Sequence, residues 1–197
     1  SGQCKADLVI FNGTATVYEI KSERDTLSRL ERQIAAYRDI FATVYVIAGE
    51  NHIDDIMEQV PQDVGVMLLS PKNSITRVRK AISQPERTRP EAIFDSLRTA
   101  EAKRILTDFG ITVPNVPNTV LNQYLRSLFV TLSPSQAHEG MVQTLRQTRT
   151  LMPLENLVKS LPSSLHAVAL TTPIRKIDHN RLVSAVGCNL EIATGWA

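Results

Sequence analysis

The chain has 197 residues, of which 43% are hydrophobic and 21% are charged, and its formal net charge is +2. A net charge this small argues against a protein that coats nucleic acid without sequence preference. No apolar run approaches the roughly 18 residues that a membrane span requires. Cys4 and Cys188 lie at opposite ends without metal-ligand spacing, which favours reduced thiols over a disulfide framework. These features predict a globular, cytoplasmic protein with no membrane partner.

The first two apolar runs, residues 6–11 and 15–21, predict a β-hairpin, because a short turn with an Asn-Gly pair separates them. With a two-residue turn, Asp7 and Glu19 would point to opposite faces of the sheet. A three-residue loop, or a bulge with glycine in the left-handed conformation, would place Asp7, Glu19 and Lys21 on one face. We therefore predict a bulge or a three-residue loop at this turn.

These residues have the chemistry of a metal site. Mg²⁺ prefers hard oxygen ligands and is commonly held by one or two carboxylates together with substrate phosphate. We expect the carboxylates of Asp7 and Glu19 and the main-chain carbonyl of Ile20 to bind Mg²⁺, for which Mn²⁺ would substitute. Lys21 would then orient the attacking water or help to deprotonate it.

On the helix expected after the hairpin, Gln33 and Tyr37 stand four residues apart. Together with Asp7 and the Glu19-x-Lys21 motif, they resemble the PD-(D/E)XK nuclease superfamily, and in particular its RecB-like branch, which carries a Q-x-x-x-Y motif. A little-characterised bacterial and phage-borne family of that superfamily is similar over the first third of the chain. The resemblance implies a restriction-endonuclease-like fold, with Gln33 and Tyr37 beside the active site and the substrate.

Each candidate residue also has a simpler interpretation. Glu19 and Lys21 would form a solvated ion pair at the end of a hairpin. Tyr37 belongs to an apolar stripe at helical spacing, which is more often core than active site, and Gln33 borders that stripe. Lys5 could face the substrate phosphate, although an exposed lysine at a sheet edge is the more ordinary explanation.

One feature departs from the superfamily pattern. Its core usually begins with a helix and a further strand before the strand that bears the aspartate, and this chain has no room for them. The sequence starts at Ser1 without an initiator methionine, so we expect a fragment, a processed chain or a sequence recorded without its beginning.

The rest of the amino-terminal half predicts a mixed sheet flanked by helices. We expect a helix over residues 24–41, a strand over 43–48, a helix over 53–60 and a strand over 64–69. These strands are almost continuously apolar, which is typical of strands covered on both faces.

Basic residues gather directly after this region. Residues 1–70 carry 6 basic and 11 acidic side chains, whereas residues 71–104 carry 9 basic and 4 acidic ones. Such a segment could follow a phosphate backbone, and the alternative is a solvated linker. The candidates for nucleic-acid contact are Arg77, Arg79 and Lys80 in this segment and Lys5 before the hairpin.

The pattern therefore predicts three parts: a nuclease-like core over residues 1–71, a basic linker over 72–90, and a small, mainly helical domain over 91–197. Within the last part, Ser133 and Gln136 have the spacing of a helix-capping box. No motif in this part indicates a reaction.

The leading hypothesis is a Mg²⁺-dependent nuclease that hydrolyses phosphodiester bonds in DNA, with RNA as the alternative substrate. A second hypothesis is a non-catalytic module that keeps the nuclease fold and binds nucleic acid or protein. A third is a subunit whose protein partner, or second copy, completes the site. The association of the resembling family with mobile elements implies a role in defence, DNA processing or inter-bacterial toxicity.

Overall fold

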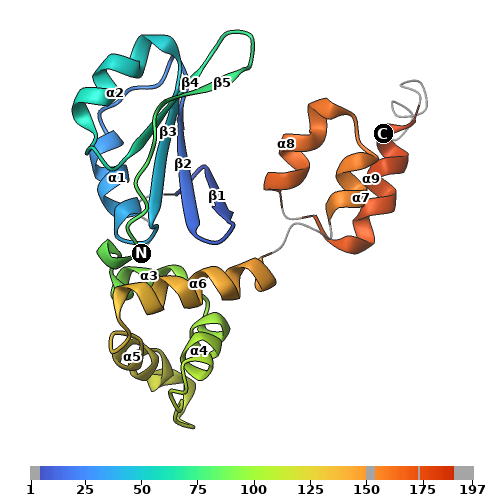
Figure 1. Cartoon of the computed structure of the whole chain (residues 1–197). Helices are drawn as coiled ribbons and strands as arrows, with labels where there is room; N and C mark the ends of the chain where they lie inside the picture. The colour runs from blue at the N-terminus through green and yellow to red at the C-terminus, as the bar shows by residue number, and fades with distance from the viewer. Residues whose placement is uncertain (1–4, 150–153, 173, 189–197) are drawn as a thin grey trace. The chain divides into compact units, whose positions relative to one another are not determined.

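The computed structural model describes residues 5–149, 154–172 and 174–188, so that Ser1 and Cys4 lie outside the described residues. The chain divides into two compact units, Ser1–Thr148 and Arg149–Ala197 (Figure 1). Within the described ranges, none of the helices combines the length and the apolarity that crossing a membrane would require.

A mixed sheet lies in the first unit, and this confirms the predicted α/β class. Its described strands follow one another across the sheet in chain order, with β1 and β5 at the two edges. The central strands β2, β3 and β4 are parallel, while each edge strand is antiparallel to its neighbour. The strands are β1 (Leu8–Phe11), β2 (Ala15–Lys21), β3 (Thr43–Ala48), β4 (Gly65–Leu69) and β5 (Ile75–Arg79).

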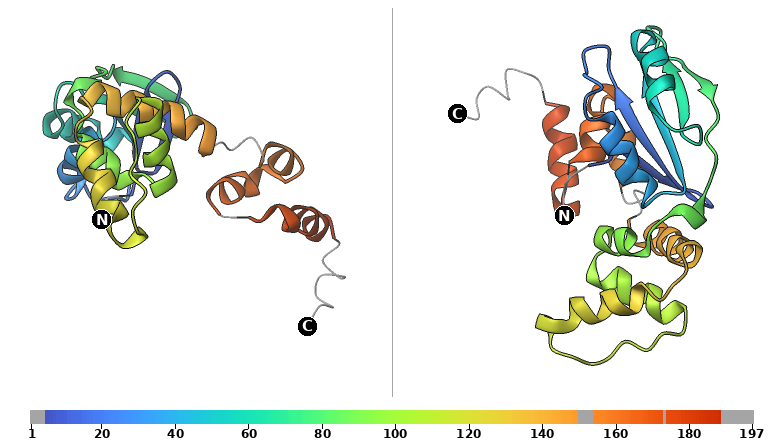
Figure 2. Two further views of the ribbon diagram at one scale, coloured as in Figure 1. Left: turned by 90° about the horizontal axis from the view of Figure 1, so that it is seen from below. Right: turned by 90° about the vertical axis from the view of Figure 1, so that its left-hand side faces the viewer.

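Helices α1 (Leu30–Arg38) and α2 (Ile53–Gln59) are the crossovers between the parallel strands, and they lie on one side of the sheet (Figures 1 and 2). Their apolar side chains pack against the valines that point to that face. The fully buried members of this core are Val17, Leu30, Ile34, Val44, Val46, Ala48, Ile56, Val64 and Val66.

The opposite face of the sheet is less covered than the apolar runs predicted. Every residue of β3 is buried, because it is the central strand of the sheet. Towards the two edges, however, Leu8, Ile10 and Ile20 are 43–45% exposed and Ile75 is 55% exposed. The apolar runs therefore overstate burial on this face outside the central strand, even at Ile20 on β2, which has a neighbouring strand on each side.

Helix α1 is shorter than the predicted helix over residues 24–41. The residues before it form a turn instead, in which the Asp25 carboxylate accepts hydrogen bonds from the main-chain N–H of Ser22 at 2.6 Å and from its hydroxyl at 2.7 Å. Short polar side chains compete in this way with helical hydrogen bonds. These contacts, the Ser22 hydroxyl first, lower the pKa of the exposed Asp25 carboxyl.

The segment expected as a basic linker contributes structure to the sheet. Strand β5 lies within residues 72–90 and forms a hairpin with β4. In the turn, Asn73 has a φ of 58°, a left-handed conformation that asparagine tolerates, and the Ser70 N–H donates to the Ser74 carbonyl at 2.9 Å. The sequence analysis missed this hairpin because basic residues interrupt the apolar alternation of β5.

The remainder of the first unit is a helical layer with its own core. Its helices are α3 (Pro90–Ser96), α4 (Thr99–Asp108), α5 (Asn118–Phe129) and α6 (Pro134–Thr148), preceded by the 3-10 helix η2 (Pro85–Arg87). The predicted capping box is confirmed at α6: the Ser133 N–H donates to Gln136 Oε1 at 2.9 Å, and the Gln136 N–H donates to Ser133 Oγ at 3.3 Å. This core includes Ile93, Ile105, Leu106, Leu125, Phe129 and Met141, all of them buried.

The second unit is helical in its described part. It contains α7 (Glu155–Lys159), α8 (Ser163–Thr171), the 3-10 helix η4 (Lys176–Asp178) and α9 (His179–Val186). Residues 167–170, an apolar run, belong to α8. Cys188, directly after α9, is a free cysteine.

Candidate functional site

The first hairpin has the register that the site requires. Phe11 pairs with Ala15 and Leu8 pairs with Tyr18, so residues 12–14 form a three-residue loop. Gly13 takes a φ of 72° within it. This confirms the predicted loop, and the register continued by one residue places Asp7 beside Glu19.

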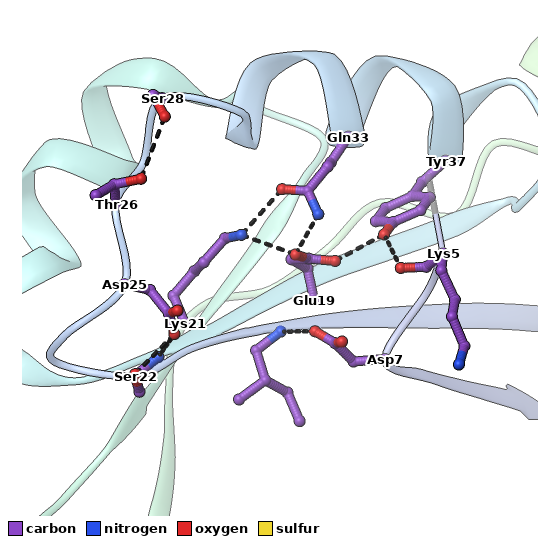
Figure 3. Close-up of polar contacts among 11 residues, drawn as sticks. Lys5, Asp7, Glu19, Lys21, Ser22, Asp25, Thr26, Ser28, Gln33 and Tyr37 are labelled. Atoms are coloured by element: carbon purple, nitrogen blue, oxygen red, sulfur yellow. Dashed lines mark hydrogen bonds and ion pairs between the residues drawn. The ribbon is translucent and has the colours of Figure 1, made fainter. Parts of the chain in front are cut away.

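Glu19 lies at the centre of a buried polar cluster on the face that α1 covers (Figure 3). Glu19 is 3% exposed, and its carboxylate accepts hydrogen bonds from three donors. Lys21 Nζ lies 2.8 Å and Gln33 Nε2 lies 2.6 Å from Glu19 Oε1, while the Tyr37 hydroxyl lies 2.7 Å from Oε2. The structure thus brings together four of the residues that the sequence analysis selected.

The side chains of the cluster are hydrogen-bonded to one another and to the main chain. Lys21 is 8% exposed, and its ammonium donates both to Glu19 and to Gln33 Oε1, the latter at 2.9 Å. The Tyr37 hydroxyl has one hydrogen and two nearby acceptors, Glu19 and the Lys5 carbonyl at 2.9 Å, so it donates to one of them at a time. Buried charges are tolerated when they are paired and hydrogen-bonded in this way.

Asp7 and Ile20 stand apart from this cluster. Asp7 is exposed, and its Oδ2 accepts the main-chain N–H of Ile20 at 2.8 Å (Figure 3). Both carboxylate oxygens of Glu19 are already engaged by protein donors. Among the residues that the structure describes, no three His, Cys, Asp or Glu side chains gather as a set of metal ligands. A Mg²⁺ ion held by Asp7, Glu19 and Ile20 stays a prediction.

The four candidates for nucleic-acid contact lie at the two edges of the sheet. Lys5 is exposed just before β1, whereas the other three lie on or directly after β5. Arg77 and Lys80 are exposed. Arg79 is held by main-chain carbonyls instead, since its Nε donates to Val64 at 2.8 Å and its Nη2 donates to Pro61 at 3.1 Å.

Two further polar groups escaped the sequence analysis. Asp63 accepts two hydrogen bonds from Arg38, at 3.0 and 3.2 Å, and lies 3.8 Å from Arg87, whose pKa is lowered chiefly by burial. His138 is 4% exposed, and its Nε2 accepts the Ala42 N–H at 3.4 Å. Burial lowers the pKa of His138 to about 4. No local sequence motif predicts these contacts, because they join residues far apart in the sequence.

The fold and these contacts define a mixed α/β protein with a closed polar cluster under α1. A family model described as "Bacteriophage P4 protein cII" matches residues 2–165, and the chain belongs to that family. The curated protein "Protein cII" of Enterobacteria phage P4 is 32% identical over 114 residues. The match covers 56% of this chain and 43% of that relative, so the chain spans less than half of the relative's length. No solved structure matches the chain with significance.

This membership overturns the central sequence-based interpretation. The assignment to the PD-(D/E)XK superfamily is wrong, and so are the predicted metal-dependent hydrolysis of phosphodiester bonds and the prediction of an enzyme. The alternative, a non-catalytic module or complex subunit with a nuclease fold, finds no support either. Only the expected phage origin fits the family. In the structure, Glu19, Lys21, Gln33 and Tyr37 are hydrogen-bonded to one another.

Proposed function

We propose that this protein is a phage regulatory protein that binds DNA through the β4–β5 hairpin. The observation that carries the proposal is a hairpin whose turn and second strand are largely exposed and which has basic and no acidic side chains. Residues 64–85 contain Lys72, Arg77, Arg79 and Lys80 and lack aspartate and glutamate altogether. Phosphate contacts by lysine and arginine supply much of the affinity of DNA-binding proteins.

The exposed part of the hairpin suits contact with the DNA backbone. Strand β4 is paired with β3, so the turn and β5, and not a free two-stranded ribbon, are the parts that would meet the phosphates. Strand β5 is an edge strand whose first four residues are all exposed, and the turn between β4 and β5 points away from α1 and α2 (Figure 1). Arg79 stiffens the hairpin by binding carbonyls near the start of β4, which leaves Lys72, Arg77 and Lys80 to face the phosphates.

The comparisons support the setting of this function. Membership of the bacteriophage P4 protein cII family makes a role in the phage the natural one, and control of phage genes is a task that DNA binding serves. The finer classification of the sheet as restriction-endonuclease-like stays a prediction about fold, and no activity follows from it. A Mg²⁺ ion plays no part in this proposal.

Fluorescence anisotropy with labelled duplex DNA, measured over a series of salt concentrations, tests the proposal. The variant is Arg77→Ala/Lys80→Ala, and the control is Arg29→Ala/Arg32→Ala, which removes two exposed basic residues next to and on α1. We expect the hairpin variant to bind more weakly and to lower the salt slope by about 0.9 for each lost phosphate contact. The control should bind as the native chain does.

Equal losses in the two variants would contradict the role of the hairpin, since any reduction of positive charge would then suffice. Tighter binding of duplex RNA of the same sequence would contradict DNA as the partner. A native chain that binds neither nucleic acid would refute the proposed function as a whole.

A further inference from the structure

A cavity of about 470 Å³ lies in the first unit, between α6, the turn from β1 to β2 and the segment around η2. Its lining residues on α6 recur at spacings of one and three residues, so they share one face of the helix. Most of the lining residues are polar, among them Thr14, His138 and Arg146. The volume lies within the usual range of small-molecule sites.

The His138 imidazole offers this cavity a hydrogen-bond donor that the protein does not use. His138 is 4% exposed, and its Nε2 accepts the Ala42 N–H, so the neutral ring carries its proton on Nδ1. Among the described residues, Nδ1 has no hydrogen-bond partner, yet it is not enclosed by protein atoms. The small accessible part of His138, which lines the cavity, therefore includes a free N–H group.

Thr14 provides a second donor. Its Oγ1 is enclosed and has no hydrogen-bond partner in the described ranges of the chain. An enclosed hydroxyl without a partner is unfavourable. Rotation about χ1 exchanges the positions of the hydroxyl and the methyl group and breaks no hydrogen bond, so a ligand with an acceptor oxygen can draw the hydroxyl into the cavity. Carboxylates and phosphates present such oxygens.

The charged side chains of the cavity favour a negatively charged ligand. Glu139 lines the cavity, but its Oε1 already accepts the Gln143 side-chain N–H at 3.0 Å. Arg146 also lines it, is exposed, and has neither an ion-pair nor a hydrogen-bond partner within the part of the chain that the structure describes. A guanidinium group binds a carboxylate or a phosphate through two parallel hydrogen bonds.

We propose that this cavity binds a small organic anion. The carboxylate or phosphate group of the ligand pairs with Arg146, and its other oxygen atoms accept hydrogen bonds from His138 Nδ1 and the Thr14 hydroxyl. His138 and Arg146 stand about 12 Å apart along the axis of α6, so an elongated molecule suits them better than an inorganic ion. This inference goes beyond the proposed DNA binding and does not depend on it.

An NMR titration of the full chain, observed at the Cε1–H signal of His138, tests the inference. His138→Gln removes this signal and so assigns it. The probes are glutarate, a dicarboxylate, and glycerol 3-phosphate, each added at constant ionic strength and neutral pH, where His138 is uncharged. We expect at least one probe to shift the signal to saturation, with a dissociation constant of about 10 mM or lower. The tighter probe identifies the anionic group of the ligand.

Two variants locate the binding. Arg146→Ala should raise the dissociation constant at least about fivefold. Thr14→Val keeps the shape of the side chain and should raise the constant about two- to tenfold. It should not lower the thermal unfolding midpoint, because the lost hydroxyl has no partner in the free protein. The matched control, Arg32→Ala, removes an exposed arginine of α1 and should bind as the native chain does.

A His138 signal that neither probe shifts, up to about 100 mM, would overturn the inference. Binding that both Arg146→Ala and Thr14→Val leave unchanged would also overturn it, because the anion would then lie elsewhere on the protein.

Discussion

The Glu19 cluster and the β4–β5 hairpin are two sets of charged side chains on one sheet. The first set is buried, and the second is largely exposed. Glu19 and Lys21 are 3% and 8% exposed and bind only groups of their own chain, whereas Arg77 and Lys80 face solvent. The set that matched a catalytic motif is the closed one, and the set with no motif is the accessible one. Residue types at a given spacing therefore do not show whether a site can be reached.

The largest change in stability is expected when the buried Glu19 carboxylate is removed. Glu19→Ala leaves the buried Lys21 ammonium without its ion-pair partner, and such a loss costs about 3–5 kcal/mol. Urea unfolding should show this decrease in the free energy of unfolding. The double variant Glu19→Leu/Lys21→Met removes both charges and should be clearly less destabilised. If both variants are equally unstable, the ion pair is not the reason.

The buried His138 imidazole provides a second test, because it makes the free energy of unfolding depend on pH. The pKa of His138 is about 4 in the folded protein and about 6.5 in an unfolded chain. Between these values the unfolded chain binds a proton that the folded chain does not, so the free energy of unfolding decreases as the pH falls from about 6.5 to about 4. The decrease is about 3 kcal/mol at most.

Thermal or urea unfolding across this pH range, compared between the native chain and His138→Gln, isolates that contribution. The variant can still accept a hydrogen bond from Ala42 but does not titrate there. Parallel stability curves for the two proteins would contradict a buried, neutral His138.

The third test removes one hydroxyl. Tyr37→Phe eliminates the donor that reaches Glu19 and the Lys5 carbonyl, and we expect a loss of about 1–2 kcal/mol in urea unfolding. Tyr18→Phe is the matched control, because Tyr18 is half-buried on the opposite face, where it stacks on Tyr45. Similar losses in the two variants would indicate that the cluster adds nothing to stability.

The smallest effect is expected at the hairpin. Arg77→Ala should change the free energy of unfolding by no more than about 0.5 kcal/mol, as is usual for exposed side chains. Arg79→Ala should cost more, since it removes hydrogen bonds to the Val64 and Pro61 carbonyls. A larger loss for Arg77→Ala than for Arg79→Ala would contradict the assignment of Arg77 as exposed and of Arg79 as hydrogen-bonded.

The sequence predicted two local features of the fold correctly. The loop at Gly13 followed from alternation and the need to place Glu19 on one face with its neighbours, and the capping box at Ser133 followed from spacing alone. Both depend on residues close together in the chain, where strand and helix geometry leave few alternatives.

The sequence analysis selected four residues that meet in the structure, but it did not predict that they are buried and bonded to one another. Gln33 and Tyr37 do meet Glu19, as the resemblance implied, yet the contacts close the site instead of opening it. Spacing could not show this, because burial of Glu19 depends on how α1 packs on the sheet. The partners of Asp63 and His138 were beyond prediction for the same reason, since they come from distant segments.

Strand β5 ends one side of the sheet, so its outer main-chain groups have no neighbouring strand among the described residues. Such an edge can recruit a strand from another molecule and begin aggregation, and charged side chains on the edge oppose this. Arg77 and Lys80, which are exposed on and directly after β5, therefore also oppose the addition of a foreign strand at this edge. The charges that we propose for DNA contact thus have a second effect, which does not require DNA. A variant that neutralises them removes the protection of an edge strand that also carries Ile75 and Val78, which are 55% and 46% exposed.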